Sequence, residues 1–444
     1  MRWSVPVDRR VAEAVIATFS DSAERSYARL AALQLRDWEG SYRWLIASGM
    51  ALYFLDRLQT LRIESALPAA IVGRLQQNLS DHRKRSAFMR AEFIAVNRAF
   101  LRAGVRYCNL KGFTLAPDYC PDPALRSQMD LDFLVDGRQL DVCRRVLNEL
   151  GYTQTTETQN EWEFKASSSE MISIEDHFKP RPQRTIELHF STTSEPPYGA
   201  SCDERLNRLA QREWDDDRFP VLRPEDQFVG QALHLLQHLL SPGTRLSWLL
   251  EYKRFVSTHD DDQHLWNRVH ECSKAYQEAH TAIGLASSLA NQIFGGSSPA
   301  QLDKWTLDCL PRNVRLWASC LGHKALLAGP PGTKLYLLLE AELADDDGEW
   351  RRRKRSRLLP VHRKVARIAC PSTEESLRER IHREIYQIRF ILFRIRFHIV
   401  EDIRYLVESR RWRRLLARQC QSALCESRDA GSEQELRSMV VHVD

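Results

Sequence analysis

A short strand-like segment carrying two acidic residues constrains this chain more than any other feature. Residues 126–135 read Arg-Ser-Gln-Met-Asp-Leu-Asp-Phe-Leu-Val. Because successive side chains of a strand point to opposite faces, Asp130 and Asp132 share one face, while Leu131 and Phe133 point into a core. Two adjacent carboxylates repel each other unless a cation lies between them, and Mg²⁺ prefers carboxylate and phosphate oxygens. The segment therefore predicts a strand that carries a divalent-metal site.

A second segment repeats this alternation further along the chain. In Ile-Glu-Leu-His-Phe, residues 186–190, Glu187 and His189 share one face. Three carboxylates from two strands can hold two Mg²⁺ ions beside a triphosphate, where they activate an attacking hydroxyl and stabilise the leaving pyrophosphate. Asp-x-Asp alone is more often a solvated strand face. The glycine turn and the arginine that precede it, and the second acidic strand, favour the metal site.

Several runs of residues together resemble the bacterial uncharacterised nucleotidyltransferase family, which is placed in the polymerase-β-like nucleotidyltransferase superfamily. The runs are Leu110-Lys111-Gly112, Asp118-Tyr119, Pro121-Asp122-Pro123, Arg126 and Asp130-Leu131-Asp132-Phe133-Leu134-Val135. Glu187-Leu188-His189-Phe190 is similar to the family's Asp/Glu-Leu-His-aromatic motif, and His234 and His238 fall where the family has a helix with paired histidines. The resemblance covers residues 25–410 and is strongest over 105–240.

The resemblance implies an α+β fold and a chemistry. The expected fold is a polymerase-β-like nucleotidyltransferase core, a small mixed sheet of three to five strands with flanking helices, embedded in mostly helical N- and C-terminal regions. The expected reaction moves NMP from an NTP such as ATP to an acceptor hydroxyl, with two Mg²⁺ ions, or Mn²⁺ in their place. In this reaction Asp130 and Asp132 hold both metals, and Glu187 completes one metal site and orients or deprotonates the acceptor.

The turn after the first strand departs from the superfamily, which usually has Gly-Ser or Gly-Gly there. Here the turn is Lys111-Gly112-Phe113-Thr114. We expect Lys111 and the Thr114 hydroxyl to replace the missing phosphate contacts, with Arg126 and His189 beside the nucleotide. Two alternatives remain open: a structural ion pair of Arg126 with Asp130 or Asp132, and a hydrogen bond of His189 to the adjacent strand.

The chain length predicts several domains. At 444 residues, the chain exceeds what one hydrophobic core usually holds. The patterns predict a helical N-terminal region (1–104), the catalytic core (105–223), a helical domain (224–350), a basic amphipathic helical region (351–420) and a polar tail expected to be disordered (421–444). Candidate strands of the core include 161–166 and 171–177, and a helix is expected over 138–150.

Charge and hydropathy narrow the location and partners. With 64 basic and 59 acidic residues, the net charge of +5 is not by itself a nucleic-acid signature. No run approaches the roughly 20 apolar residues of a membrane-spanning helix, and residues 1–10 lack an apolar signal core, so we expect a cytoplasmic protein. Two basic runs, 351–357 and 410–414, are more typical of solvated surface than of a polyanion contact.

Apolar residues recur every three or four positions between Ile381 and Leu406, which predicts a long amphipathic helix with arginines on its other face. A core-packing or dimer helix is the favoured interpretation, and a membrane-surface helix is the alternative.

Two further motifs are weaker. His234 and His238 lie four apart on a helix, but one packed histidine and one lining a cleft is a better interpretation than metal binding. Gly329-Pro330-Pro331-Gly332-Thr333-Lys334 lacks the spacing of a phosphate-binding loop and is interpreted as an interhelical turn.

Two other functions compete with catalysis: a non-catalytic nucleotide-binding scaffold or sensor, and an adaptor for polyanions or membrane surfaces acting through the basic C-terminal region. The acceptor is left open among a small molecule, a sugar, a protein and RNA.

Overall fold

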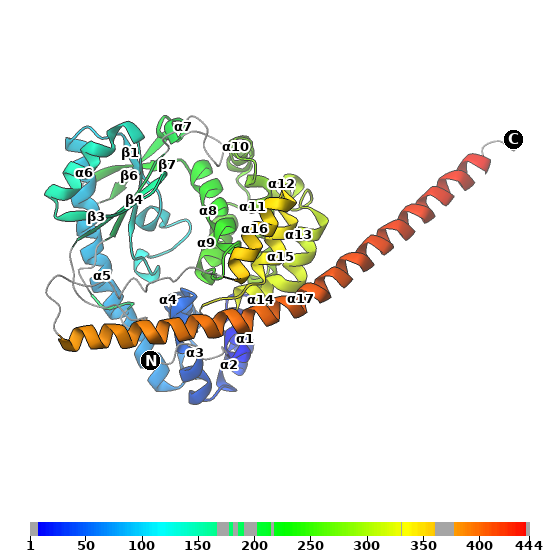
Figure 1. Ribbon diagram of the computed structural model, residues 1–444, viewed down its shortest axis with the longest axis horizontal. Helices are drawn as coiled ribbons and strands as arrows, with labels where there is room; N and C mark the ends of the chain where they lie inside the picture. The colour runs from blue at the N-terminus through cyan, green and yellow to red at the C-terminus, as the bar shows by residue number, and fades with distance from the viewer. Residues whose placement is uncertain are drawn as a thin grey trace.

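A computed structural model describes residues 8–166, 177–180, 185–190, 202–214, 217–329, 331–359 and 377–440, without the side chains of 202, 203, 379 and 419–440. A mixed sheet lies at one end of the body, a helical layer forms the rest, and one long C-terminal helix crosses the body and projects beyond it (Figure 1). Within these residues, no helix combines the length and apolar character needed to cross a bilayer. The candidate strand at 171–177 lies almost entirely outside the described residues.

The sheet contains seven described strands in the order β3-β4-β5-β2-β1-β7-β6. Two neighbouring pairs, β2 with β5 and β1 with β7, are parallel, and the others are antiparallel. The strands are β1 (Tyr107–Asn109), β2 (Leu131–Val135), β3 (Tyr152–Glu157), β4 (Glu161–Ala166), β5 (Thr185–His189), β6 (Leu209–Trp214) and β7 (Asp217–Leu222). The expected α+β architecture is confirmed, but the sheet is wider than the predicted three to five strands because the hairpin β6–β7 adds to its far edge.

Along the chain, helices come before, between and after the strands of the sheet, and together they build the rest of the body. Before it come α1 (Arg9–Ala17), α2 (Ala23–Ala31), α3 (Leu35–Ala47), α4 (Met50–Leu61) and α5 (Ala69–Arg102), and within it come α6 (Leu140–Glu149) and α7 (Cys202–Leu206). After it come α8 (Pro224–Leu239), α9 (Leu246–Thr258), α10 (Gln263–Ser273), α11 (Ala279–Phe294), α12 (Ala300–Trp305), α13 (Arg312–Trp317), α14 (His323–Leu326), α15 (Tyr336–Glu342), α16 (Asp347–Leu358) and α17 (Leu377–Val440). The helix expected over 138–150 corresponds to α6.

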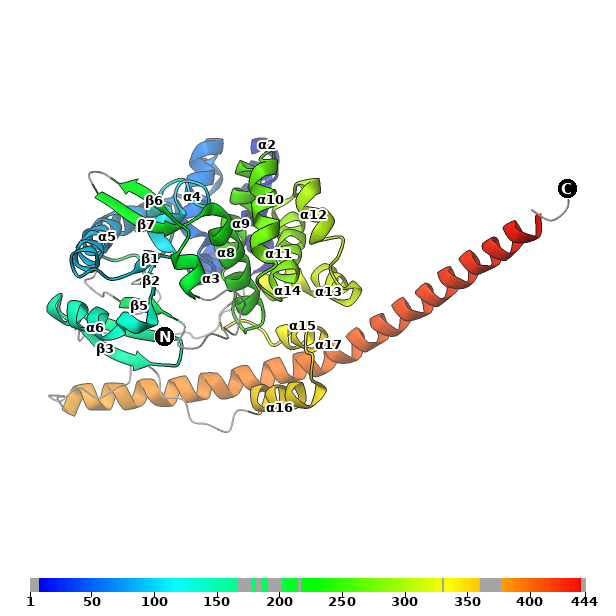
Figure 2. The same ribbon diagram turned by 90° about the horizontal axis from the view of Figure 1, so that it is seen from above.

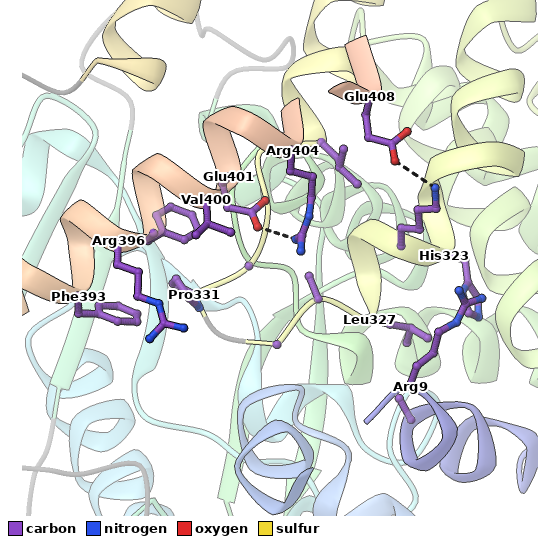
Figure 3. Close-up of a pocket in the computed structure, with 17 residues that line it drawn as sticks. Arg9, His323, Leu327, Pro331, Phe393, Arg396, Val400, Glu401, Arg404 and Glu408 are labelled. Carbon is purple, nitrogen blue, oxygen red and sulfur yellow. Dashed lines mark hydrogen bonds and ion pairs between the residues drawn. The ribbon is translucent and has the colours of Figure 1, made fainter. Parts of the chain in front are cut away.

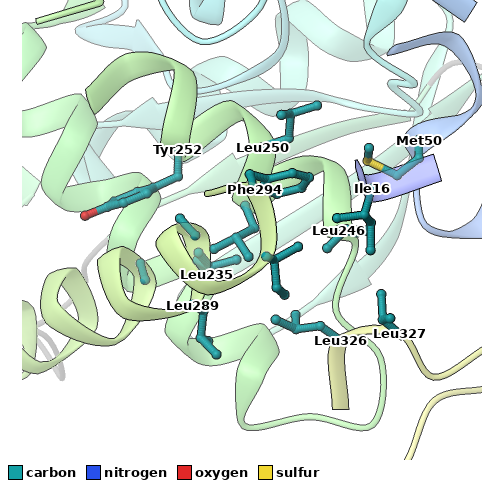
Figure 4. Close-up of a cluster of buried hydrophobic side chains, with 14 of the residues drawn as sticks. Ile16, Met50, Leu235, Leu246, Leu250, Tyr252, Leu289, Phe294, Leu326 and Leu327 are labelled. Atoms are coloured by element: carbon teal, nitrogen blue, oxygen red, sulfur yellow. The ribbon is translucent and has the colours of Figure 1, made fainter. Parts of the chain in front are cut away.

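Two large hydrophobic cores hold these elements. The helices before and after the sheet share one core, to which Ile16 and Met50 contribute from the N-terminal side and Leu235, Leu250 and Leu289 from the C-terminal side (Figure 4). The second core lies against the sheet and includes the C-terminal half of α5. The predicted helical segments 1–104 and 224–350 therefore share one core, except for the C-terminal half of α5, which packs against the sheet.

The turn that resembles a truncated phosphate loop is a packing element. Gly332 has a φ of 93°, and a Cβ there would lie 1.5 Å from the Pro242 carbonyl oxygen, so only glycine fits. The next residue, Thr333, is buried, and its hydroxyl donates to Glu401 of α17 at 2.7 Å. The turn thus connects the helical layer to the long helix.

The structure continues α17 through residues 421–440, where the sequence predicts a disordered tail. The segment is polar, but it contains good helix formers such as Ala423, Glu435 and Leu436 and no proline. A helix already nucleated upstream extends through such residues at low cost.

Candidate functional site

The two acidic strands lie side by side in the sheet. β2 pairs with β5 in parallel, with Asp132 opposite Glu187. Because the two residues share a register position, their side chains project from the same face of the sheet. The alternate residues of both strands belong to the core on the other face: Leu131, Phe133, Ile186 and Leu188. The alternation read from the sequence therefore positions the acidic pair.

Asp132, Glu187 and His189 form a tight cluster of metal-ligand type. One ligand atom from each lies within 4.8 Å of the other two. His189 Nε2 lies 3.1 Å from Asp132 Oδ1 and 3.8 Å from Glu187 Oε2. The hydrogen-bond partner of His189 is thus a carboxylate of the site, and two carboxylates with one imidazole make a donor set suited to a divalent cation.

Lys111 is the cation that the chain itself supplies to this cluster. Its Nζ lies 3.3 Å from Asp132 Oδ1. Burial disfavours the charged form of Lys111, but the charges of Asp132 and Asp130 outweigh it and raise the pKa of the amine. The predicted phosphate ligand is therefore poised at the cluster in its ammonium form.

The carboxylates are only partly neutralised by this lysine. Burial alone would raise the pKa of Asp132, but the charge of Lys111 and a hydrogen bond from His189 hold that pKa below its usual range. Burial and the charges of Asp130 and Asp132 raise the pKa of Glu187 to about 8. Further positive charge at the site would lower this pKa again, which fits a site that can receive a cation.

Asp130 lies just before β2, and its carboxylate is outside the group of three. Its pKa is raised by burial and by Asp132, while Lys111 and two arginines act in the opposite direction. Its backbone carbonyl accepts a hydrogen bond from Gln128 Nε2 at 2.9 Å. Asp130 thus interacts electrostatically with Asp132 and Lys111 of the cluster. Its contact with a metal stays a prediction.

Gly112 is needed by the geometry of the turn. Its φ is 68°, and a Cβ there would lie 2.4 Å from Gln128 Nε2. Only glycine combines this backbone conformation with so close a neighbour. The turn after β1 can therefore pack directly against the segment that leads into Asp130.

Two predicted nucleotide ligands already have protein partners. Arg126 Nε lies 3.2 Å from Glu251 Oε2 on α9, so its buried ion pair is with neither aspartate. The Thr114 hydroxyl accepts a hydrogen bond from Gln227 Nε2 at 3.1 Å and donates one to the Lys111 carbonyl at 3.2 Å. Phosphate contacts by either residue stay predictions.

His234 and His238 of α8 lie close enough to the acidic cluster for the charges of Lys111 and Asp132 to bear on the pKa of His234. The rings of His234 and His238 are 4.6 Å apart, and both contact Trp248. Burial, followed by the charges of Lys111 and Arg245, lowers the pKa of His238 to about 4. Both histidines thus pack against Trp248 and are held neutral by burial, and the expectation that one of them lines a cleft stays a prediction.

Sequence reasoning missed two charged residues near the cluster. Arg245 bears on the pKa of Asp130, although no motif marks it. Glu163 of β4 lies opposite Glu187 and extends the row of acids across a third strand. Its carboxylate is paired with Lys165 at 2.8 Å. Alternation within residues 161–166 could have indicated Glu163, whereas only the tertiary fold brings Arg245 here.

Comparison with known proteins identifies a family to which this chain is similar. A family model described as "Uncharacterised nucleotidyltransferase" matches residues 34–295, more than half of the chain. Among solved structures, an antigenic nucleotidyltransferase-like protein from Paracoccidioides brasiliensis is similar at 12% identity, over 41% of this chain and 86% of that one, with a TM-score of 0.25. We base no argument on a TM-score this low. No curated protein matches.

Proposed function

The chain belongs to the family of uncharacterised nucleotidyltransferases, and from this premise we propose that it transfers NMP from an NTP to an acceptor hydroxyl with release of pyrophosphate. The observation that supports this most is the convergence of Asp132, Glu187 and His189 within 4.8 Å on two parallel strands. The proposed cofactor is Mg²⁺, with Mn²⁺ as a substitute that accepts oxygen ligands equally well.

The residues divide into metal ligands and phosphate ligands. Asp132 and Glu187 would hold one cation, and Asp130 with Asp132 a second. A bound divalent cation would favour ionisation of the acceptor hydroxyl and offset the charge of the departing pyrophosphate. Lys111 would exchange its contact with Asp132 for a phosphate oxygen, because the incoming cation takes over neutralisation of the carboxylate.

A transfer assay tests this proposal. Each labelled NTP is incubated with the protein, Mg²⁺ or Mn²⁺, and cell extract, and the fraction that takes up label identifies the acceptor class. We expect Asp132→Asn and Glu187→Gln to lower transfer by at least about a hundredfold, because each removes charge stabilisation at the reacting phosphate.

The matched control is Asp141→Asn, whose side chain is 89% exposed on α6, a helix that packs through Cys143 and Leu147 into the core on the sheet face opposite the acidic cluster. It should retain full activity, and the circular dichroism and melting temperature of all variants should show that they fold. Unchanged turnover in Asp132→Asn or Glu187→Gln would exclude this mechanism.

A non-catalytic nucleotide scaffold is the second candidate. The ion pair of Lys111 with Asp132 favours it, because the site partly satisfies its own charges. Calorimetric binding of MgNTP without pyrophosphate release, over a broad panel of acceptors, would support the scaffold over the enzyme.

A further inference from the structure

Helix α17 is held against the body along one side. Trp412 is buried, and its Nε1 donates to Glu342 of α15 at 3.0 Å. Glu401 is buried and accepts hydrogen bonds from the Thr333 hydroxyl at 2.7 Å and the Lys334 amide at 3.2 Å. These contacts fix which side of the helix faces outward.

The same inner side of α17 covers a cavity of about 480 Å³ between α17, α14 and the segment around Pro331 (Figure 3). Both acidic side chains that line it are paired, Glu401 with Arg404 and Glu408 with Lys324. This side of the helix is therefore engaged with the body.

The outer side of α17 carries a continuous apolar stripe. Each of its members has between 44% and 60% of its surface exposed: Ile381, Ile385, Ile388, Leu392, Ile395, Ile399, Ile403 and Leu406. At 1.5 Å per residue the stripe is about 38 Å long. Contiguous apolar surface of this extent on a folded protein marks a binding site.

Exposed arginines are frequent along the helix that carries this stripe. Among the α17 side chains that the structure describes (377–378 and 380–418), ten arginines are exposed, from Arg378 to Arg418, and Glu384 is the one exposed acid. Of the ten, Arg396 and Arg404 line the cavity on the inner side, and Arg404 and Arg411 pair with acids of the same helix. Helix α16, with the exposed basic run 351–357, lies beside α17 in both views (Figures 1 and 2). The whole face is apolar along its centre and cationic at its borders.

We propose that this face binds the surface of an anionic lipid bilayer. The stripe lies at the level of the headgroups, with its isoleucines and leucines inserted, and the flanking arginines of α17 and α16 contact lipid phosphates. A second copy of the chain fits less well. Two helices packed through their stripes would bring the arginines of both together, with Glu384 of each as the exposed acid to offset them.

Vesicle sedimentation of the full-length protein tests the proposal. We expect binding to phosphatidylcholine vesicles that contain about a third phosphatidylserine, little binding to pure phosphatidylcholine, and weakening at high salt. Arg389→Gln/Arg410→Gln should weaken binding about 25-fold, since each arginine near an anionic surface is worth about a factor of five. Ile388→Ser/Leu392→Ser/Ile395→Ser should abolish it.

Matched controls separate this face from general charge and from the acidic site. Arg25→Gln/Arg29→Gln removes two exposed arginines of α2, which lies opposite α17 in Figure 2, and should bind as the unmodified protein does. Asp132→Asn should also bind normally, so loss of transfer activity and loss of lipid binding are distinguishable.

Two results would overturn the proposal. One is sedimentation with anionic vesicles that neither the arginine variant nor the serine variant changes. The other is a dimer in analytical ultracentrifugation that the serine variant dissociates, together with no vesicle binding, which would show that a second copy covers the stripe.

Discussion

At the scale of single residues, Gly112 sets how closely the turn after β1 approaches the segment that leads into Asp130. We expect Gly112→Ala to destabilise the protein, because it combines a positive φ with a collision against Gln128. Gly151→Ala is the control, since its φ of 85° imposes similar strain and nothing lies within 4 Å. The control should cost about 1 kcal/mol, and Gly112→Ala about 1–3 kcal/mol more. Equal costs in urea denaturation would show that the close approach to Gln128 does not matter.

His82 gives the protein a pH dependence at the same scale. It is 2% exposed, its Nδ1 lies 2.7 Å from the Ala124 carbonyl, and burial lowers its pKa to about 4. Between pH 6.5 and 4, His82 is protonated in the unfolded chain but stays neutral in the folded protein. The free energy of unfolding therefore falls as the pH drops, by up to roughly 3 kcal/mol. Denaturation curves at pH 7 and pH 4.5 should show a smaller fall for His82→Gln, which keeps an amide donor but does not titrate. An identical fall in both proteins would contradict this assignment.

At the scale of elements, the sequence predicts the strands in which polar and apolar residues alternate, and it predicts few of the other contacts. The strands that carry Asp132 and Glu187 are predictable because polar and apolar residues alternate over five positions, a purely local signal. The β6–β7 hairpin is not, since β6 is polar at several positions and lies at the edge of the sheet. Likewise, the pairing of Arg126 with Glu251 joins residues 125 positions apart, so no local pattern could indicate it.

That pairing also connects the segment before β2 to the helical layer. Both side chains are at most 10% exposed, and Glu251 also accepts a hydrogen bond from Tyr53 of α4 at 2.9 Å. Glu251→Gln should destabilise the protein by about 3–5 kcal/mol, because it leaves the Arg126 charge buried and uncompensated. The double variant Arg126→Met/Glu251→Met should recover most of this loss. A double-mutant cycle in guanidinium denaturation that shows no coupling would mean that the pair does not act as a unit.

At the scale of the whole molecule, the two hydrophobic cores group elements that are not consecutive in the sequence. Helices α1–α4 share a core with α8–α15, although the sheet separates them in sequence. Helix α5 takes part in both cores, with Leu75 in the first and Phe93 in the second. The acidic cluster lies on the sheet, and His234 and His238 of α8, in the helical layer, lie within reach of the charge of Lys111, so the surroundings of the site come from both units.

This division predicts how stability is distributed. Phe228 packs on Tyr252 and Phe255 in the helical core, while Phe133 packs on Phe100 in the sheet core. Each Phe→Leu change should cost roughly 1–3 kcal/mol by leaving a void. In native-state hydrogen exchange, Phe228→Leu should speed exchange in α1–α4 as well as α8–α11 and leave β3–β4 unchanged, because units that share a core open together. Phe133→Leu should do the reverse. Faster exchange confined to α8–α11 in Phe228→Leu would show that the N-terminal helices are an independent unit, so that chain order and not the shared core sets the cooperative boundaries.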